Sequence, residues 1–170
     1  MTKIEKKIAI LEDAIQQIID GFFAVNQGRV AVFFNYTYDW QQYSEQEFQN
    51  FLLKDNKQCL VCAKGALLVS AIRKFDSCSA RSFLDLTTPS FCTTKNVLTK
   101  LFGQKTLDRM EVLFEGVIYP WTHKTYQNSP EGEALLKRHE TLPGVLDKRL
   151  IAIFKAEIAT EKAKLALKKA

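Results

Sequence analysis

Cys59-Leu-Val-Cys-Ala-Lys-Gly-Ala-Leu-Leu-Val-Ser-Ala-Ile-Arg73 is a nearly uncharged run that contains a Cys-x-x-Cys pair and one glycine. At helical spacing its bulky apolar residues fall on one side, so the pattern predicts a helix over residues 59–74. Glycine in a helix interior costs about 1 kcal/mol relative to alanine. Gly65, in the middle of the bulky side, therefore indicates that another element packs unusually close to it. The run predicts a buried central helix whose thiols are chemically idle.

The length and composition of the chain are those of one globular domain. A chain of 170 residues can bury about 70% of the surface that its unfolded form exposes. A hydrophobic content of 46% and a charged content of 25% argue against a disordered chain. We expect a single, mainly α domain over residues 1–160, a compact bundle of about six helices with one extended aromatic segment. Residues 161–170 are rich in Ala and Lys and are expected to fray or project.

An N-terminal helix is predicted by a capping box of Thr2 and Glu5 and by apolar residues that step by three and four. These apolar residues are Ile4, Ile8, Leu11, Ile15, Ile18 and Phe22. We expect the helix to end near Asn26, because Gly28 follows. The apolar stripe suits packing inside the bundle, and pairing with a second copy of the chain in a homodimer is the alternative.

Further helices are predicted from caps and periodicity, over residues 45–53, 94–102, 106–119 and 131–140. The helix that starts at Thr106 carries core-spaced residues, which are Leu107, Met110, Phe114 and Val117. Leu142-Pro143-Gly144 breaks the pattern, and a last helix follows. Its apolar side carries Leu146, Leu150, Phe154, Ile158 and Leu165.

Residues 29–40 differ from the rest of the chain, because Phe34, Tyr36, Tyr38 and Trp40 alternate with polar residues. This is the period of a strand, and the residue types favour strands. No second segment shows an equally clear strand pattern. The sequence therefore predicts an extended segment, either an aromatic arm that lies on the helices or an edge strand that pairs across a dimer.

Aromatic and basic side chains occur together in two places, which we identify as candidate ligand-binding groups. The first group is Arg29, Tyr36, Tyr38 and Trp40; the second is Trp121, His123, Lys124 and Tyr126, in a predicted surface loop. Such rings can stack on bases or nucleotides while the cations contact phosphate. The alternative is that the rings lie half-buried over the helices with their polar atoms at the rim. For Trp40 we favour this alternative.

The four cysteines favour neither a metal site nor a catalytic one. The spacing Cys59-x2-Cys62-x15-Cys78-x13-Cys92 contains one close pair, whereas structural zinc sites usually show two. A thioredoxin-like role would require the pair at the start of a helix in a βαβ unit, which the sequence does not show. Cys59 at a predicted helix N-terminus could still have a lowered pKa, so an enzyme built on Cys59 or His123 stays as a minority alternative. We predict no catalytic residues, no metal and no cofactor.

Three segments of the chain together resemble a known group of proteins. They are Cys59-Leu-Val-Cys-Ala-Lys-Gly-Ala-Leu67, Thr106-Leu-Asp-Arg-Met-Glu-Val-Leu-Phe-Glu-Gly116 and Lys148-Arg-Leu-Ile-Ala-Ile153. In this order they resemble a diffuse group of small uncharacterised bacterial and phage proteins. Such proteins have no established activity, so the resemblance implies a compact α-rich domain and an accessory role in bacteria or phage. It assigns no functional residue.

The sequence predicts a cytoplasmic protein. No apolar stretch reaches the roughly 18 residues that span a bilayer, and the N-terminal residues do not form a signal peptide. Without export, the cysteines are expected to be reduced thiols.

We expect a non-catalytic binding or regulatory protein that acts through a protein interface or a small anionic, nucleotide-like ligand. No nucleophile elbow, P-loop or dinucleotide-binding motif occurs in the chain. The alternative is a nucleic-acid-binding module that uses two basic regions. Residues 61–110 hold eight Lys and Arg against three Asp and Glu, and residues 144–170 hold seven against three.

Overall fold

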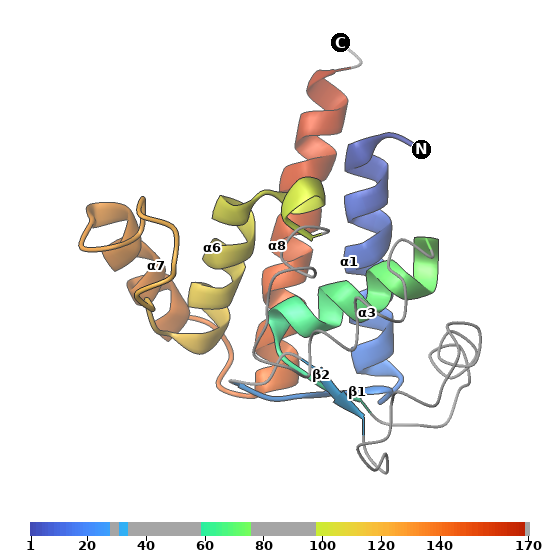
Figure 1. The fold of residues 1–170 in the computed structure, drawn as a ribbon, viewed down its shortest axis with the longest axis horizontal. Coiled ribbons are helices and arrows are strands. Elements are labelled where there is room, and N and C mark those ends of the chain that lie inside the picture. The colour runs from blue at the N-terminus through green and yellow to red at the C-terminus, as the bar shows by residue number, and fades with distance from the viewer. Residues whose placement is uncertain (28–30, 34–58, 76–97, 169–170) are drawn as a thin grey trace.

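Two long helices form the frame of the protein in a computed structural model that describes residues 1–27, 31–33, 59–75 and 98–168. Helix α1 spans Lys3–Ile19 and helix α8 spans Leu146–Leu167. They pack side by side in opposite directions, and the C-terminal end of α8 projects beyond the other elements (Figure 1). The predicted mainly α fold is confirmed.

The N-terminus of α1 has the predicted capping box. The hydroxyl Oγ1 of Thr2 accepts a hydrogen bond from the backbone N–H of Glu5 at 3.2 Å, and Oε2 of Glu5 accepts one from the N–H of Thr2 at 2.7 Å. The predicted end near Asn26 is wrong, since the helix ends at Ile19. The chain turns at Gly21, and the residues that follow pair as a strand.

The segment after Gln58 forms a strand and then a helix, so the single helix predicted over residues 59–74 is wrong at its start. Strand β3 spans Cys59–Val61 and helix α3 spans Ala63–Phe75. The strand forms because two partners from earlier in the chain, β1 (Phe23–Val25) and β2 (Ala31–Phe33), satisfy its backbone hydrogen bonds. The sequence could not distinguish the strand from the helix, because a short apolar run shows neither the period of a strand nor that of a helix.

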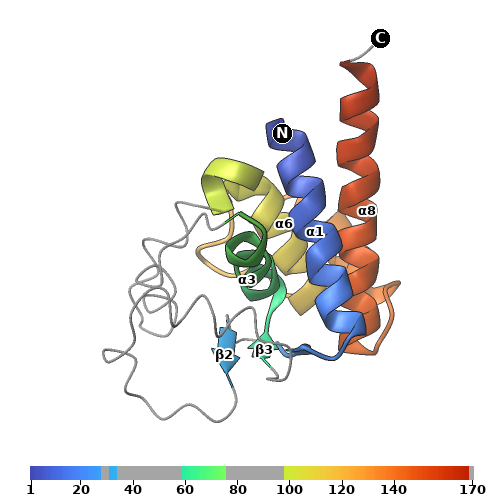
Figure 2. The ribbon, with the colours of Figure 1, turned by 90° about the vertical axis from the view of Figure 1, so that its right-hand side faces the viewer.

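The three strands form a small mixed sheet in the order β1-β3-β2. β3 pairs in parallel with β1, where Phe23 lies opposite Cys59, and antiparallel with β2, where Val32 lies opposite Leu60. The sheet lies at the end of the molecule opposite the projecting end of α8 (Figure 2). Of the segment predicted to be extended, residues 31–33 form β2, which pairs with β3 of the same chain.

α3 is the central helix that the sequence predicts. It packs against both α1 and α6, and its small residues on the side away from the bulky residues are also buried. These small residues are Ala63, Ala66 and Ser70, with exposed fractions of 2% or less. Gly65 is buried as well. Close packing on two sides explains why this helix carries so few charged or long side chains.

Two further long helices lie on the side of α8 that faces away from α1 (Figure 1), whereas a short helical segment before them lies beside the start of α1. Residues 98–102 are helical, α6 spans Gln104–Glu115, and α7 spans Pro130–Glu140. Leu107, Met110 and Phe114 are buried as predicted. Val117 is 45% exposed, so its predicted place in the core is wrong, because α6 ends at Gly116 in a left-handed C-cap.

The C-terminal tail is more regular than a frayed end. α8 continues to Leu167, and the side chain of Glu161 is buried against α1. Lys7 Nζ contacts Glu161 Oε1 at 3.0 Å and Lys164 Nζ contacts the same oxygen at 2.8 Å. The tail over residues 161–170 therefore begins with a packed residue and projects only after it.

Several predictions fall outside the part of the chain that the structure describes. These are the helix over residues 45–53, the start of the helix over 94–102, and the alternating residues 34–40, as well as Cys78 and Cys92.

Candidate functional site: a pocket lined by lysines

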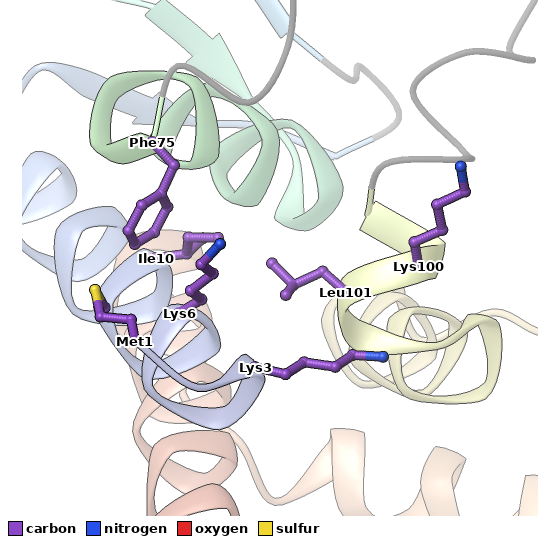
Figure 3. A pocket seen from close by; sticks show the side chains of 7 residues that line it. All are labelled: Met1, Lys3, Lys6, Ile10, Phe75, Lys100 and Leu101. Atoms are coloured by element: carbon purple, nitrogen blue, oxygen red, sulfur yellow. The ribbon is translucent and has the colours of Figure 1, made fainter.

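A pocket of about 450 Å³ lies between the first turns of α1, the end of α3 and residues 100–101. Its volume is in the range of small-molecule sites. Figure 3 shows the side chains that line it, which are Met1, Lys3, Lys6, Ile10, Phe75, Lys100 and Leu101. Three segments that are far apart in the sequence thus meet at one hollow.

The helical repeat of α1 places Lys3, Lys6 and Ile10 on one face, because residues three and four apart are neighbours on a helix. Ile10 is 1% exposed and forms the apolar base, while the two lysines are exposed. Phe75 is the last residue of α3. Across the pocket, Leu101 points towards α1 (Figure 3).

The electrostatics of the pocket are cationic. Its lining holds three ammonium groups and, in the described part of the chain, no carboxylate. Lys6 Nζ lies 5.8 Å from the centroid of the Phe75 ring, a cation–π distance. Lys3, Lys6 and Lys100 form no ion pair with any described residue. In the described part of the chain, no carboxylate therefore neutralises these three charges.

The neighbouring lysines on the α1–α8 contact behave differently. Lys7 contacts Glu161, and Lys162 Nζ contacts Glu12 Oε1 at 3.2 Å. These pairs join the two helices and neutralise the cations that take part. Their role is structural, and the contrast separates them from the lysines of the pocket.

The predicted aromatic loop places its four candidate residues in different environments. Trp121 is 68% exposed and Lys124 is exposed, whereas Tyr126 is buried and its hydroxyl donates to the carbonyl oxygen of Lys105 at 3.2 Å. The ring of His123 accepts a hydrogen bond at Nδ1 from the N–H of Thr125 at 3.2 Å. Tyr126 thus packs in the core, Trp121 and Lys124 are exposed, and His123 is partly buried.

Trp121 does not stand alone at the surface. Its ring stacks on that of Tyr119, with centroids 4.7 Å apart and planes at 5°. Val117, in the same connection between α6 and α7, is also exposed. Arg29, Tyr36, Tyr38 and Trp40, the other candidate group, lie outside the described residues.

A buried carboxylate holds this loop against the helices. Asp108 is fully buried and accepts hydrogen bonds from Lys64 Nζ at 3.1 Å, from Gln104 Nε2 at 2.7 Å and from the backbone N–H of His123 at 2.8 Å. Lys64 also contacts Glu111 at 2.6 Å. Burial lowers the pKa of Lys64, but the two carboxylates outweigh it, so the pKa lies above its ordinary value. The network joins α3, α6 and the loop.

The two cysteines that the structure describes, Cys59 and Cys62, are both buried. Cys59 is fully buried and lies in strand β3, not at a helix N-terminus. The reason for expecting a lowered pKa at this residue is therefore wrong. Burial raises the pKa of Cys62 to about 11, although the backbone N–H groups of Gly65 and Lys64 act in the opposite direction. A thiol with this pKa is protonated at neutral pH and is a poor nucleophile. Among the described residues, no group of three or more His, Cys, Asp or Glu could hold a metal ion.

The sequence alone does not predict the pocket lined by lysines. The spacing of Lys3, Lys6 and Ile10 gives one wall, but nothing local to Lys100 or Phe75 indicates that they complete it.

The comparisons with known proteins assign no function. Neither the family models, nor the curated proteins, nor the solved structures contain a match to this chain. No helix in the described ranges is long and apolar enough to cross a membrane.

Proposed function

We propose that this protein is a small non-catalytic binding protein that holds an anionic ligand in the pocket lined by lysines. The observation that carries the proposal is the set of three ammonium groups, without a carboxylate partner in the described chain, around an apolar base. Apolar lining supplies binding free energy, and a few charged groups fix the orientation of the ligand. Because the pocket is open and its cations are exposed, we expect a Kd on the order of 10–100 µM.

Fluorescence titration with anilinonaphthalene sulfonate, an anion with an apolar body, tests the proposal. Replacing Lys3, Lys6 and Lys100 together with Gln should raise the Kd about tenfold, because the attraction to the sulfonate is lost. The matched control replaces three exposed lysines elsewhere on the surface, Lys137, Lys148 and Lys155, with Gln. It makes the same change in net charge and should leave the Kd unchanged. Equal effects of the two triple variants, or no binding at all, would refute the proposal.

The ion pairs of the basic regions support a small anion over a nucleic acid. In residues 61–110 the cations of Lys64, Arg73 and Arg109 contact carboxylates. In residues 144–170, Lys162 and Lys164 do so. A polyanion would have to compete with these pairs. The nucleic-acid alternative predicts a gel shift at low salt whose affinity falls steeply as salt is added.

A second candidate function is association of two copies of the chain, favoured by the exposed apolar side chains of Val117 and Trp121. The apolar stripe of α1 is less suited to this purpose, because Ile4, Leu11 and Ile15 are buried within the chain. Sedimentation at micromolar concentration should show a dimer that Trp121→Ser dissociates. A 19.4 kDa monomer for the unmodified chain would rule out this candidate.

A further inference from the structure

The polar side chains of the described lining are all cationic. Of the described lining residues, Lys3, Lys6 and Lys100 supply ammonium groups, which donate hydrogen bonds and cannot accept them. The other four contribute carbon atoms and one thioether sulfur. A nucleobase carries N–H donors on its edge, and this lining offers them no side-chain oxygen acceptor. The described side chains therefore offer donors to a phosphate but no partner to the N–H groups of a base.

The apolar part of the lining suits an aliphatic chain. Among the described lining residues, Ile10 and Leu101 are branched aliphatic residues and Phe75 carries the one aromatic ring. Lys6 already lies over this ring, at 5.8 Å from its centroid. A planar ligand would have to displace that ammonium group from the face it covers, whereas an alkyl chain can lie along Ile10 and Leu101 without doing so.

The cations suit a head group with more than one charge. Lys3 and Lys6 lie on α1, and Lys100 comes from the segment across the pocket (Figure 3). Lysine binds phosphate as a point charge and needs no bidentate geometry. Coulomb attraction to three cations is stronger for a dianionic phosphate monoester than for a carboxylate.

From these three observations we infer that the ligand is a single-chain aliphatic phosphate, with alkyl carboxylates as weaker ligands of the same site. The inference rests on the proposed function and names its ligand class. It goes against the nucleotide-like ligand that the sequence suggested. The ligand is taken as a monomer from solution, and the same head group in a bilayer is the competing source.

Isothermal titration calorimetry of the full chain tests the inference with hexyl, octyl and decyl phosphate below their micelle-forming concentrations. Inorganic phosphate, adenosine monophosphate and decanoate are the comparison ligands. The affinity should rise two- to about fourfold for each added methylene, as expected for burial of CH₂ groups. Decyl phosphate should bind about tenfold more tightly than adenosine monophosphate, which carries the same head group. The Lys3, Lys6 and Lys100 triple variant should lose the binding, and the surface-lysine control should keep it.

A variant of the apolar wall separates the two parts of the ligand. Leu101→Asn should flatten the dependence on chain length while leaving weak phosphate binding in place, and circular dichroism checks that the variant is folded. The inference is overturned if adenosine monophosphate binds as tightly as decyl phosphate, or if the affinity does not depend on the length of the alkyl chain. The proposed function stands in both cases. Absence of binding by every anion overturns both. Binding to phosphatidylcholine vesicles that contain phosphatidate, without binding to monomeric alkyl phosphates, would show that the head group is recognised in a bilayer. That result would overturn the inference of a ligand taken from solution.

Discussion

The carboxylate of Asp108 is surrounded by donors from three parts of the chain, and it shows how one residue fixes a loop. Lys64 comes from α3, Gln104 from the start of α6, and the N–H of His123 from the loop itself. The sequence does not identify Asp108 as a buried carboxylate, because helical spacing alone does not reveal a cation 44 residues earlier in the chain. Tyr126 lies in a loop that the sequence predicts at the surface, but its ring is buried and its hydroxyl donates to the backbone carbonyl of Lys105.

Asp108→Asn should lower the free energy of unfolding by about 2–4 kcal/mol, because it leaves Lys64 partly buried with one carboxylate instead of two. Glu111→Gln is the matched control, since its side chain is 18% exposed and its loss should cost about 1 kcal/mol. Urea unfolding at pH 7 measures both. Equal costs would show that Asp108 is not the centre of the network.

Cys62 should resist alkylation. Its pKa of about 11 lies above the ordinary value of 9.0, so at pH 8 its thiolate fraction is about 100-fold below that of a free thiol. Iodoacetamide labelling, read by mass spectrometry of the peptide that contains Cys62, should therefore be at least this much slower in the native protein than in urea. The raised pKa stabilises the fold below pH 9, and this contribution is lost as the pH rises through about 11. Labelling at the rate of the unfolded chain would contradict the burial.

The elements differ in how far local sequence determines them. The start of α1 was predicted to the residue, because a capping box involves neighbours in the chain. The local sequence does not predict the division of residues 59–75 into β3 and α3, because β3 forms through hydrogen bonds to β1 and β2. The lysine pocket was missed for the same reason, since its walls come from residues about 25 to 95 positions apart.

The contact between α1 and α8 should weaken in acid. The ion pairs of Glu161 with Lys164 and Lys7 outweigh the effect of burial and hold its pKa below the ordinary value of 4.5. The stabilisation is therefore complete above pH 4.5 and is lost as the pH falls through the lowered pKa. Glu161→Gln should lower stability at pH 7 and reduce the difference between pH 7 and pH 3 in urea unfolding. Glu12→Gln, at an exposed pair with Lys162, should leave that difference nearly unchanged. The prediction fails if the two variants behave alike.

The junction of α6 and α7 depends on Gly116. Its φ is +72°, and a Cβ there would lie 2.5 Å from Nε2 of His139, whose Nδ1–H donates to the carbonyl oxygen of Leu113 at 2.8 Å. Gly116→Ala should cost about 2–4 kcal/mol, from backbone strain and displacement of this ring. Gly21→Ala isolates the strain, because Gly21 has φ +74° and open space around its Cβ, and it should cost about 1–2 kcal/mol. Thermal unfolding compares the two, and an equal loss would show that His139 gives way freely.

Across the whole molecule, the lysine and arginine side chains fall into two groups. Cations that join elements are paired, as at Lys7, Lys64 and Arg109, while those around the pocket have no carboxylate among the described residues. The mainly α class followed from periodicity, which composition and caps reinforce. The sequence does not predict which lysines are paired with carboxylates, because pairing between α1 and α8 depends on how the two helices pack.

The position of the pocket at the start of α1 has a consequence for motion. The first turn of a helix is where its backbone opens most readily, and this turn forms one wall of the hollow while the end of α3 and residues 100–101 form the others. An occupant that bridges the walls would hold all three against local opening. Amide hydrogen exchange near the start of α1 should then slow on addition of decyl phosphate, while exchange in α7, on the far side of α6, keeps its rate.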